Sequence, residues 1–291
     1  MNAAADVQIT IRDIETIDEM RLVEELQKEI WGIPDLDVVP VYHLAAAVAS
    51  GGILLGAFDA DEMVGFAYGF VGHERGITVH HSHMLAVKSE YRSHDIGYKL
   101  KHEQRIRVLT QGIKVMTWTF DPLQSLNAYF NFAKLGVIAD QYYVDFYGAD
   151  AASFLHRNGT DRLWVSWHFD TERSTKKLDG AIQTQNLADV PRLVTAKETG
   201  EPFVADPDIA RSSAQVAIEI PADINAMEGK DIQLARAWRI ATRKAFTDAL
   251  DAGLIVEDFY RTGEPTRSIG VYVLGRDPGP MNWKVKEERA K

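Results

Sequence analysis

The sequence predicts an α/β fold of the α+β kind, in which helices flank a central sheet. Apolar and polar residues alternate at 7–14, as expected of a half-buried strand, whereas apolar residues recur at helical spacing in 15–30. Two apolar segments, 53–58 and 63–71, flank a polar turn and predict a β-hairpin. A strand, a helix and a second strand are then expected in succession at 77–120.

The remaining elements of the first half follow from the same patterns. Gly51 and Gly136 end two of the helices, because glycine readily adopts the left-handed conformation found at helix C-termini. Gly112 leads into the strand that closes the strand–helix–strand unit. The predicted strands cover residues 77–87, 113–120, 137–147 and 163–169, and the predicted helices cover 41–49, 96–111 and 125–136.

Residues 171–180 are polar and end in glycine, which is typical of a linker. We therefore expect a first domain at 1–170 and a C-terminal α/β domain at 181–291. The order of strand, long helix, Gly253 and strand in this second half resembles that of 85–120, and one interpretation is a degenerate second copy of half the first domain. The alternatives are a cover for a pocket of the first domain or a dimer contact. The expected elements are a helix at 232–252 and strands at 215–220, 254–260 and 268–274.

The composition indicates a globular protein. With 291 residues, 46% of them hydrophobic, the chain can bury a core large enough for one or two domains. No apolar segment is long enough to cross a bilayer, and the first residues lack the layout of a signal peptide, so no membrane partner is expected. The absence of cysteine fits a reducing compartment and predicts a cytoplasmic protein. It also excludes a covalent cysteine intermediate.

The net charge of −10 argues against a nucleic-acid partner, because proteins that bind nucleic acid usually present a basic face. A local basic cluster nevertheless lies within the helix predicted at 96–111, and it suits the phosphates of a nucleotide. This cluster consists of Lys99, Lys101, Arg105 and Arg107.

A candidate anion-binding loop joins the strand at 77–87 to the helix at 96–111. The first N–H groups of the helix and the positive end of its dipole point toward the turn before it, a geometry that suits a pyrophosphate. Asp95 is predicted to cap the helix, and the Arg92 guanidinium adds a positive charge. An ordinary solvated turn is the alternative. The candidate residues are Leu85, Ala86, Val87, Arg92, Ser93, His94, Asp95, Ile96, Gly97 and Tyr98.

This order of strand, loop and helix resembles the acyl-CoA-binding core of the GNAT superfamily of N-acyltransferases. That family has a Leu-x-Val strand end, an aromatic residue followed by Arg or Gln, and glycines at the helix start. The helix at 125–136 also resembles the family's fourth helix. Matching residues are Leu85, Val87, Tyr91, Arg92 and Gly97 in the loop region and Ala128, Lys134, Leu135 and Gly136 in the helix.

The resemblance covers roughly residues 7–170. It implies a mixed, mostly antiparallel sheet flanked by helices, with acyl-CoA as the co-substrate and no metal. The donor is expected to be acetyl-CoA or succinyl-CoA. The resemblance also places Asn127 and Phe132 at the cofactor, although Asn127 equally suits a plain position at the start of a helix.

Two positions depart from the family pattern. Asp95 replaces the first glycine of the loop; Asp tolerates unusual backbone angles, but it brings a carboxylate beside an anion site. Phe132 replaces a tyrosine that often protonates the departing thiolate, and phenylalanine cannot donate a proton. Tyr129, one turn earlier, is expected to substitute, with an ordinary core or rim tyrosine as the alternative.

His81 and His83 are the candidate general bases. By strand alternation they are expected to share a face with Leu85 and Val87, whereas His80 points to the other side. The His-x-His pattern is similar to that of arylalkylamine acetyltransferases in this superfamily, in which two histidines relay the amine proton. Imidazole titrates near neutral pH, which suits this role. The alternatives are structural histidines or a metal site.

The resemblance places Trp31, Trp118 and Asp121 at the acceptor pocket, with core or turn positions as the alternative. The expected function is transfer of an acetyl or succinyl group from acyl-CoA to a primary amine of a small molecule, an amino acid being favoured. The alternatives are a non-catalytic acyl-CoA sensor and a protein lysine acyltransferase. A homodimer is the expected assembly.

Overall fold

The structure is a computed structural model, and it describes residues 8–148, 158–180, 185–262 and 268–276. The chain forms two compact units. The first comprises Met1–Trp118 with Ser153–Leu155, and the second comprises Thr119–Ala152 with His156–Lys291. The domain boundary expected at 171–180 stays a prediction.

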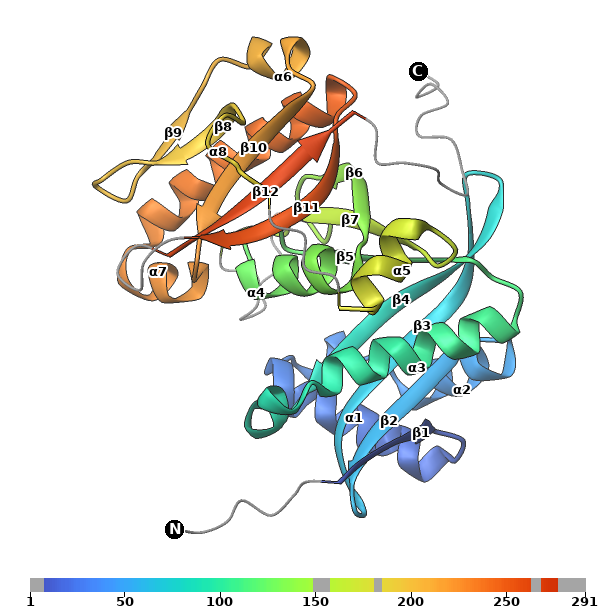
Figure 1. Cartoon of the computed structure of the whole chain (residues 1–291). Helices are drawn as coiled ribbons and strands as arrows, with labels where there is room; N and C mark the ends of the chain where they lie inside the picture. The colour runs from blue at the N-terminus through green and yellow to red at the C-terminus, as the bar shows by residue number, and fades with distance from the viewer. Residues whose placement is uncertain (1–7, 149–157, 181–184, 263–267, 277–291) are drawn as a thin grey trace, which may run out of the picture. The chain divides into compact units, whose positions relative to one another are not determined.

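The first unit is built on a sheet with the strand order β1-β2-β3-β4-β5 (Figure 1). Neighbouring strands are antiparallel except β4 and β5, which are parallel. The strands are β1 (Ile9–Asp13), β2 (Ile53–Asp59), β3 (Glu62–Glu74), β4 (Ile77–Val87) and β5 (Val115–Phe120), the last of which runs across the unit boundary.

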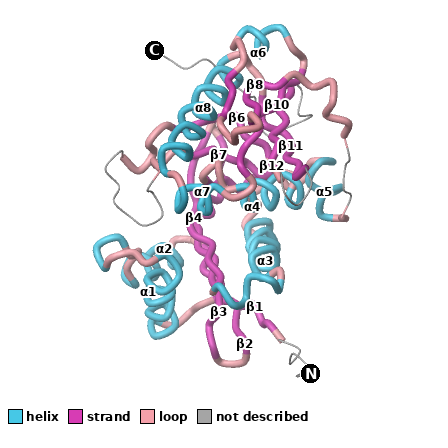
Figure 2. Tube along the Cα trace, turned by 90° about the vertical axis from the view of Figure 1, so that its left-hand side faces the viewer, coloured by secondary structure: helices cyan, strands magenta, loops and turns pink. Residues whose placement is uncertain are grey.

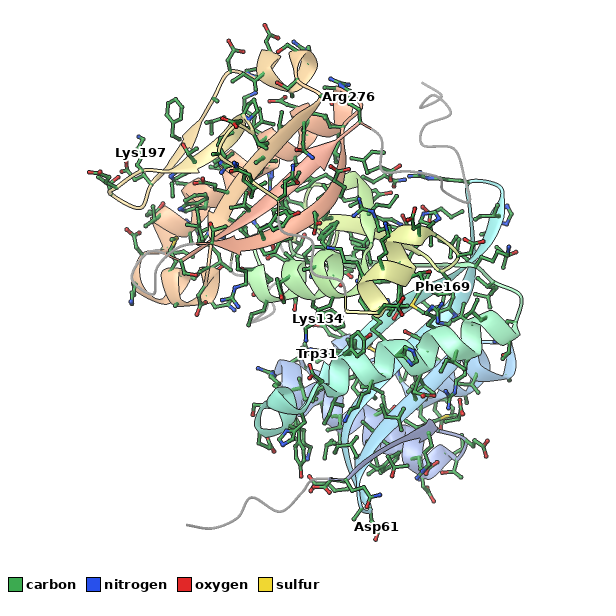
Figure 3. All side chains as sticks on the ribbon, viewed as in Figure 1. Trp31, Asp61, Lys134, Phe169, Lys197 and Arg276 are labelled. Carbon is green, nitrogen blue, oxygen red and sulfur yellow. The ribbon has the colours of Figure 1, made fainter. Side chains whose placement is uncertain are left out.

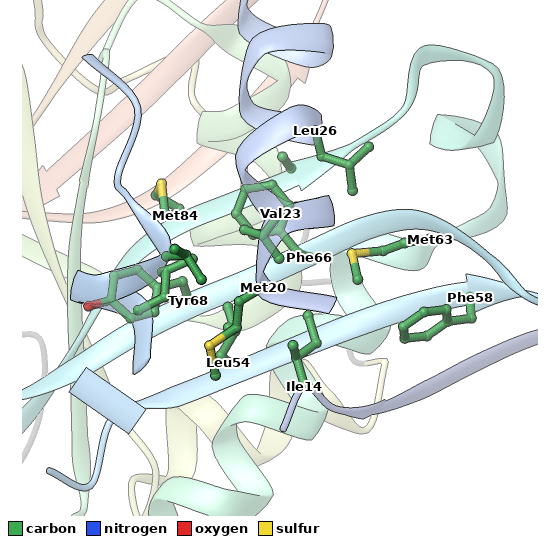
Figure 4. Close-up of a cluster of buried hydrophobic side chains, with 13 residues drawn as sticks. Ile14, Met20, Val23, Leu26, Leu54, Phe58, Met63, Phe66, Tyr68 and Met84 are labelled. Carbon is green, nitrogen blue, oxygen red and sulfur yellow. The ribbon is translucent and has the colours of Figure 1, made fainter. Parts of the chain in front are cut away.

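Helices cover both faces of this sheet. Figure 2 shows α1 (Ile17–Trp31) and α2 (Val41–Ala49) on one side of β2, β3 and β4, and α3 (Ile96–Thr110) on the other. A capping box of Thr16 and Glu19 starts α1, and Gly32, at φ 62°, ends it. The core between α1, α2 and the sheet includes Val23, Phe66 and Met84 (Figure 4).

The strands of the second unit follow one another in the order β7-β6-β11-β12-β10-β8-β9. Neighbouring strands are antiparallel, except that β8 runs parallel to β10. The strands are β6 (Ile138–Tyr143), β7 (Arg162–His168), β8 (Arg192–Ala196), β9 (Pro202–Val204), β10 (Gln215–Pro221), β11 (Ile255–Thr262) and β12 (Ile269–Gly275).

The core of the second unit centres on Tyr272. Its fully buried ring lies 5.8 Å from Phe132, 5.1 Å from Phe246 and 4.7 Å from Phe259, measured between ring centroids, and its hydroxyl donates to the Pro122 carbonyl at 2.7 Å. The helices of this unit are α4 (Ser125–Ala128), the π-helix η3 (Tyr129–Leu135), α5 (Glu172–Leu178), α6 (Asp208–Ser212), α7 (Ile224–Lys230) and α8 (Ile232–Asp251).

The predicted fold class is confirmed: the sheet is mixed, mostly antiparallel and flanked by helices. Two details differ. Residues 171–180, expected as a linker, contain helix α5, because Thr171 caps it and Lys177 is buried in an ion pair with Asp258 at 3.1 Å. The short strands β8 and β9 and the short helices α6 and α7 were not predicted.

The second half does not repeat the strand pairing of the first. β4 and β5 pair directly and in parallel around the α3 crossover. β10 and β11, joined through α8, both pair with β12, which therefore lies between them. The order of elements is thus similar but the topology differs, so the predicted second copy of 85–120 is not reproduced.

Among the described residues, no helix combines the length and apolarity needed to cross a membrane.

Candidate functional site

The loop between β4 and α3 is ordered by its own hydrogen bonds. It contains the 3₁₀ helix η2 (Ser89–His94), and the Tyr91 hydroxyl donates to Asp59 at 2.9 Å. Asp95 follows with φ 54° and ψ 22°, a left-handed conformation, and its side chain makes no cap hydrogen bond to α3. Asp95 therefore adopts the left-handed conformation that a glycine at this position would adopt readily. The prediction that the Asp95 side chain caps α3 is wrong.

Arg92 and His94 lie on the exposed side of this loop. Arg92 Nε donates to the Val87 carbonyl at 3.4 Å, and His94 Nδ1 lies 3.3 Å from the Tyr91 carbonyl. The predicted residues Arg92, His94 and Asp95 therefore lie together before the start of α3; the side chain of Ser93 is outside the described part of the chain.

The first turn of α3 presents backbone N–H groups. The first backbone hydrogen bond of the helix runs from Lys99 N–H to the Asp95 carbonyl at 3.0 Å, so the N–H groups of Ile96, Gly97 and Tyr98 precede it. No acidic residue lies in this turn. The N–H groups and the helix dipole favour an anion here.

Gly97 is not required by the packing of the chain itself. A Cβ atom at this position would meet only Leu85 Cδ2, at an ordinary 3.8 Å. Glycine within a helix costs about 1 kcal/mol relative to alanine. The glycine therefore leaves backbone uncovered at a place where a phosphate can approach closely.

Between the loop before α3 and the middle of β4, the strands β4 and β5 are not paired. They pair only at His80 with Met116 and at His81 with Thr117. In the described part of the chain, no strand pairs with this edge of β4 beyond His81, although β3 pairs with the other edge as far as Val87. An open strand edge can form backbone hydrogen bonds with an extended ligand. We call the point between Ser82 and Trp118, where pairing stops, the fork.

A β-bulge in β4 changes which residues share a face. Tyr68 pairs with Met84 and Gly69 with Ser82, so His83 is an extra residue in β4. His81 and His83 consequently lie on the α1–α2 face, together with Met84 and Ala86. Leu85 lies on the α3 face, beside Gly97.

The expectation that His81 and His83 share a face with Leu85 and Val87 is therefore wrong, because the inserted residue shifts the alternation. The expectation for His80 is confirmed, since its ring lies on the α3 side against Gln104.

The two candidate bases belong to a cluster of rings. The imidazole centroids of His81 and His83 are 6.3 Å apart, and Phe70 lies 5.4 Å from His81 and 5.8 Å from His83. Tyr68 packs edge-on against both His83 and His43, at 6.1 Å each. The Tyr68 hydroxyl is buried without a hydrogen-bond partner among the described residues, and it lies at the edge of the core cluster (Figure 4).

The surroundings of both imidazoles lower their pKa values and so favour the neutral form, which can accept a proton. Burial, the His83 charge and the Lys101 charge lower the pKa of His81 to about 4. Partial burial and the His43 charge lower the pKa of His83, whose side chain keeps solvent access. At pH 7 the rings are neutral, as a general base must be.

On the α3 face, a buried polar chain crosses from α3 to β4. Lys101 Nζ donates to Ser82 Oγ at 2.7 Å, and Ser82 donates to Gln104 Oε1 at 2.8 Å. The Gln104 amide nitrogen then faces His80 Nε2 at 3.2 Å, which places the His80 proton on Nδ1. Burial, with the Lys101 and His81 charges, lowers the pKa of His80 to about 3.

Lys101 was predicted in a basic cluster for nucleotide phosphates, and this is wrong. Its side chain is buried, with the ammonium 3.7 Å from the Trp118 ring centroid. Its position in the sequence holds the missed signal: Leu100, Lys101, Gln104 and Val108 are all buried on the sheet-facing side of α3. Arg107, another member of that cluster, forms ion pairs with Asp13 at 2.8 Å and with Glu103 at 2.6 Å.

The three predicted acceptor residues have different surroundings. Trp118 is buried under Lys101, and Trp31, the last residue of α1 (Figure 3), packs edge-on against Phe66 at 5.8 Å. Asp121 accepts from Arg239 through both oxygens, at 2.8 and 2.6 Å. This geometry favours a structural role for Asp121, while acceptor contacts by Trp31 and Trp118 stay predictions.

The predicted residues of the fourth helix lie in the second unit. Asn127 is exposed and Tyr129 is partly buried at the start of the π-helix, which also contains Lys134 (Figure 3). Phe132 is fully buried between Phe120 and Tyr272, at 6.2 and 5.8 Å between centroids. Phe132 therefore completes a core, and roles for Asn127 and Tyr129 at the cofactor stay predictions. Single π turns are frequent near functional sites.

No group of three or more metal-ligating side chains with a metal-binding arrangement occurs among the residues that the structure describes.

Comparison with known proteins finds no matching family model and no significantly similar curated protein. Solved acetyltransferase structures resemble part of the chain. A GNAT family acetyltransferase from Elizabethkingia anophelis with acetyl-CoA bound is 14% identical, covering 56% of this chain and 99% of its own, with a TM-score of 0.41. The ribosomal-protein-S18-alanine N-acetyltransferase of Escherichia coli is 12% identical, covering 56% and 96%, with a TM-score of 0.46. An N-acetyltransferase from Thermoplasma acidophilum in complex with coenzyme A is 18% identical, covering 55% and 99%, with a TM-score of 0.41.

Proposed function

We propose that the chain is an acyl-CoA-dependent N-acyltransferase that transfers an acetyl or succinyl group to the primary amine of a small molecule. The observation that carries this proposal is the parting of β4 and β5 after His81 and Thr117, which leaves one edge of β4 open toward the loop before α3, whose first turn Gly97 leaves uncovered.

The pyrophosphate, the pantetheine arm and the thioester of acyl-CoA each have a counterpart in this arrangement. The pyrophosphate would accept hydrogen bonds from the N–H groups of Ile96, Gly97 and Tyr98, with Arg92 adding charge. The two amides of the pantetheine arm would pair with the open edge of β4. The thioester would then lie near the bulge at His83, where a backbone N–H can polarise its carbonyl.

The neutral imidazoles of His81 and His83 suit removal of the amine proton, directly or through water. A lysine side chain costs about 4 to 5 kcal/mol to neutralise at pH 7, whereas an α-amine costs about 1 kcal/mol. A base with a lowered pKa is a weak base, and it is better matched to the α-amine, which is easier to deprotonate. We therefore favour an α-amine, such as that of an amino acid, as the acceptor.

Two measurements test the proposal. Calorimetry of the purified protein with CoA, acetyl-CoA and succinyl-CoA should detect binding, and a panel of amino acids should then release free thiol from one of the thioesters. Absence of binding by all three would overturn the proposal, since no other feature of the chain is offered as the acyl source.

A non-catalytic acyl-CoA sensor is the second candidate, and it is favoured by one observation. Phe132 stands where the family has a proton-donating tyrosine, and its ring is enclosed in the core of the second unit. Tight CoA binding without turnover of any amine would support the sensor and contradict the enzyme.

A further inference from the structure

Lys101 is a buried lysine that is not neutralised by an acid. Its side chain is 2% exposed, and no carboxylate of the described residues lies within ion-pair distance of it. Lysine is almost never fully buried without a paired charge, because removing an ammonium from water is costly. The fold therefore keeps this group at a cost to stability, which points to a chemical use.

The position of Lys101 is specific. Its Nζ lies 2.7 Å from Ser82 Oγ on β4 and 3.7 Å from the Trp118 ring centroid on β5. These two residues directly follow His81 and Thr117, the last pair between the strands. The amine is thus held at the fork, where the open edge of β4 begins.

The fork lies at a suitable distance from the candidate phosphate site. Val87, at the loop, lies five positions after Ser82, which corresponds to roughly 16 Å of extended strand. An extended phosphopantetheine arm covers a span of this kind. A CoA whose pyrophosphate lies at Gly97 would therefore bring its sulfur toward Lys101.

The reaction needs a proton at this sulfur. Collapse of the tetrahedral intermediate breaks the carbon–sulfur bond, and the electron pair leaves with sulfur as a thiolate. Phe132 cannot protonate it, and Lys101 is an alternative to Tyr129, the acid expected from the sequence. We propose, on the basis of the proposed function, that the Lys101 ammonium is the general acid of the reaction: its N–H bond breaks, a bond between sulfur and hydrogen forms, and neutral CoA thiol leaves.

The proton balance closes over one turnover. The acceptor amine loses one proton to the imidazole of His83 or His81, and the sulfur gains one from Lys101. Exchange with solvent then removes the proton from the imidazole and restores the ammonium, so acyl-CoA and amine give amide and thiol with no other reagent.

The groups around Lys101 tune it for this task. The titratable groups that face it are His80 and His81 on β4; Ser82, Met116, Trp118 and Gln104 do not titrate near neutral pH. Burial lowers the pKa of Lys101 well below its usual value. This brings the ammonium closer in acidity to a thiol, whose ordinary pKa is about 8.5, and such matching favours proton transfer.

Three variants test the inference. Lys101→Met keeps the length of the side chain and removes the proton, Lys101→Arg keeps the charge but does not release a proton near neutral pH, and Ser82→Ala removes the hydrogen bond that orients the amine. Lys114→Met, an exposed lysine of the same unit, is the matched control.

We expect Lys101→Met and Lys101→Arg each to lower kcat by roughly 100-fold or more, a typical contribution of a general acid, with the Kd for CoA changed less than about three-fold. The basic limb of the pH profile of kcat should be present in the wild type and absent from both variants. Ser82→Ala should lower kcat by about ten-fold and move that limb.

Wild-type turnover together with a fully active Lys101→Arg would overturn the acid role, because the charge alone would then suffice. An unchanged pH profile in Lys101→Met would do the same. If Lys101→Met fails to fold, an unshifted basic limb in Ser82→Ala overturns the inference. A wild-type protein that binds no CoA overturns the proposed function as well, so the two failures are distinguishable.

Discussion

The carboxylate of Asp121 is held by both terminal nitrogens of Arg239, at 2.8 and 2.6 Å, in a largely buried ion pair within the second unit. Asp121 follows β5 and Arg239 lies in α8, so the pair joins the end of one strand to a helix more than a hundred residues later.

Replacing Asp121 with Asn should lower the free energy of unfolding by about 3 to 5 kcal/mol, because it leaves the Arg239 charge buried without its partner. Chemical denaturation measures this loss. Asp208→Asn is the matched control, since it breaks an exposed pair with Arg211 and should cost less than about 1 kcal/mol. If Asp121→Asn leaves the stability unchanged but alters the KM for the amine, Asp121 contacts the acceptor instead.

Gly97→Ala should separate stability from CoA binding. Helix propensity favours alanine by about 1 kcal/mol, and the new methyl group meets only Leu85 at 3.8 Å, so thermal stability should rise slightly. Binding of CoA, measured by calorimetry, should weaken about ten-fold or more, because the methyl group would occupy the approach of the phosphate. Gly229→Ala in α7 should stabilise the protein equally and leave binding intact. If Gly97→Ala binds CoA as tightly as the wild type, the pyrophosphate does not bind at Gly97.

The pH dependence of kcat/KM should be governed by the acceptor. With the pKa of His81 lowered to about 4, the His81 imidazole stays neutral as the pH falls below 6.5, and burial lowers the pKa of His83 in the same direction. The activity should therefore rise with pH through the pKa of the acceptor ammonium, about 7.8 for an α-amine. His83→Ala should lower kcat/KM by roughly 100-fold, and His73→Ala, a control at the exposed end of β3, should not. Full activity of His83→Ala across pH 6 to 9 would exclude the base.

Acid should destabilise the protein partly through His80. Its pKa, about 3 in the folded state, lies below its ordinary value of 6.5, so the unfolded chain binds more protons between these values. The stabilising contribution of the neutral ring is present above pH 6.5 and is lost progressively as the pH falls toward 3. His80→Gln should flatten the dependence of unfolding free energy on pH over this window. An identical slope in the variant and the wild type would assign the acid sensitivity to other groups.

Much of the first unit could be predicted from periodicity. The bounds of α2 and β4 coincide with the predicted segments, and α1, α3 and the β2–β3 hairpin lie within two or three residues of them. These elements bury one clear face each, which is the condition under which an apolar pattern reports structure.

The rest depends on partners that are distant in the sequence. Lys177 turns a polar segment into a helix by pairing with Asp258, 81 positions later. Lys101 is buried only because β4 and β5 supply Ser82 and Trp118. The bulge at His83 leaves no mark on composition, yet it reverses the faces of the residues after it. Composition and local spacing cannot register contacts of this kind.

The bonds from Tyr272 to Pro122 and from Arg239 to Asp121 bear on how this protein can be shortened or recombined. A fragment that stopped near residue 170 would keep the loop before α3 and the fork, but it would lack Tyr272 and Arg239, so the Pro122 carbonyl and the Asp121 carboxylate would lose these partners. The added half is therefore an integral part of the folding unit that completes β5, and grafting the shorter portion onto another scaffold should yield insoluble material.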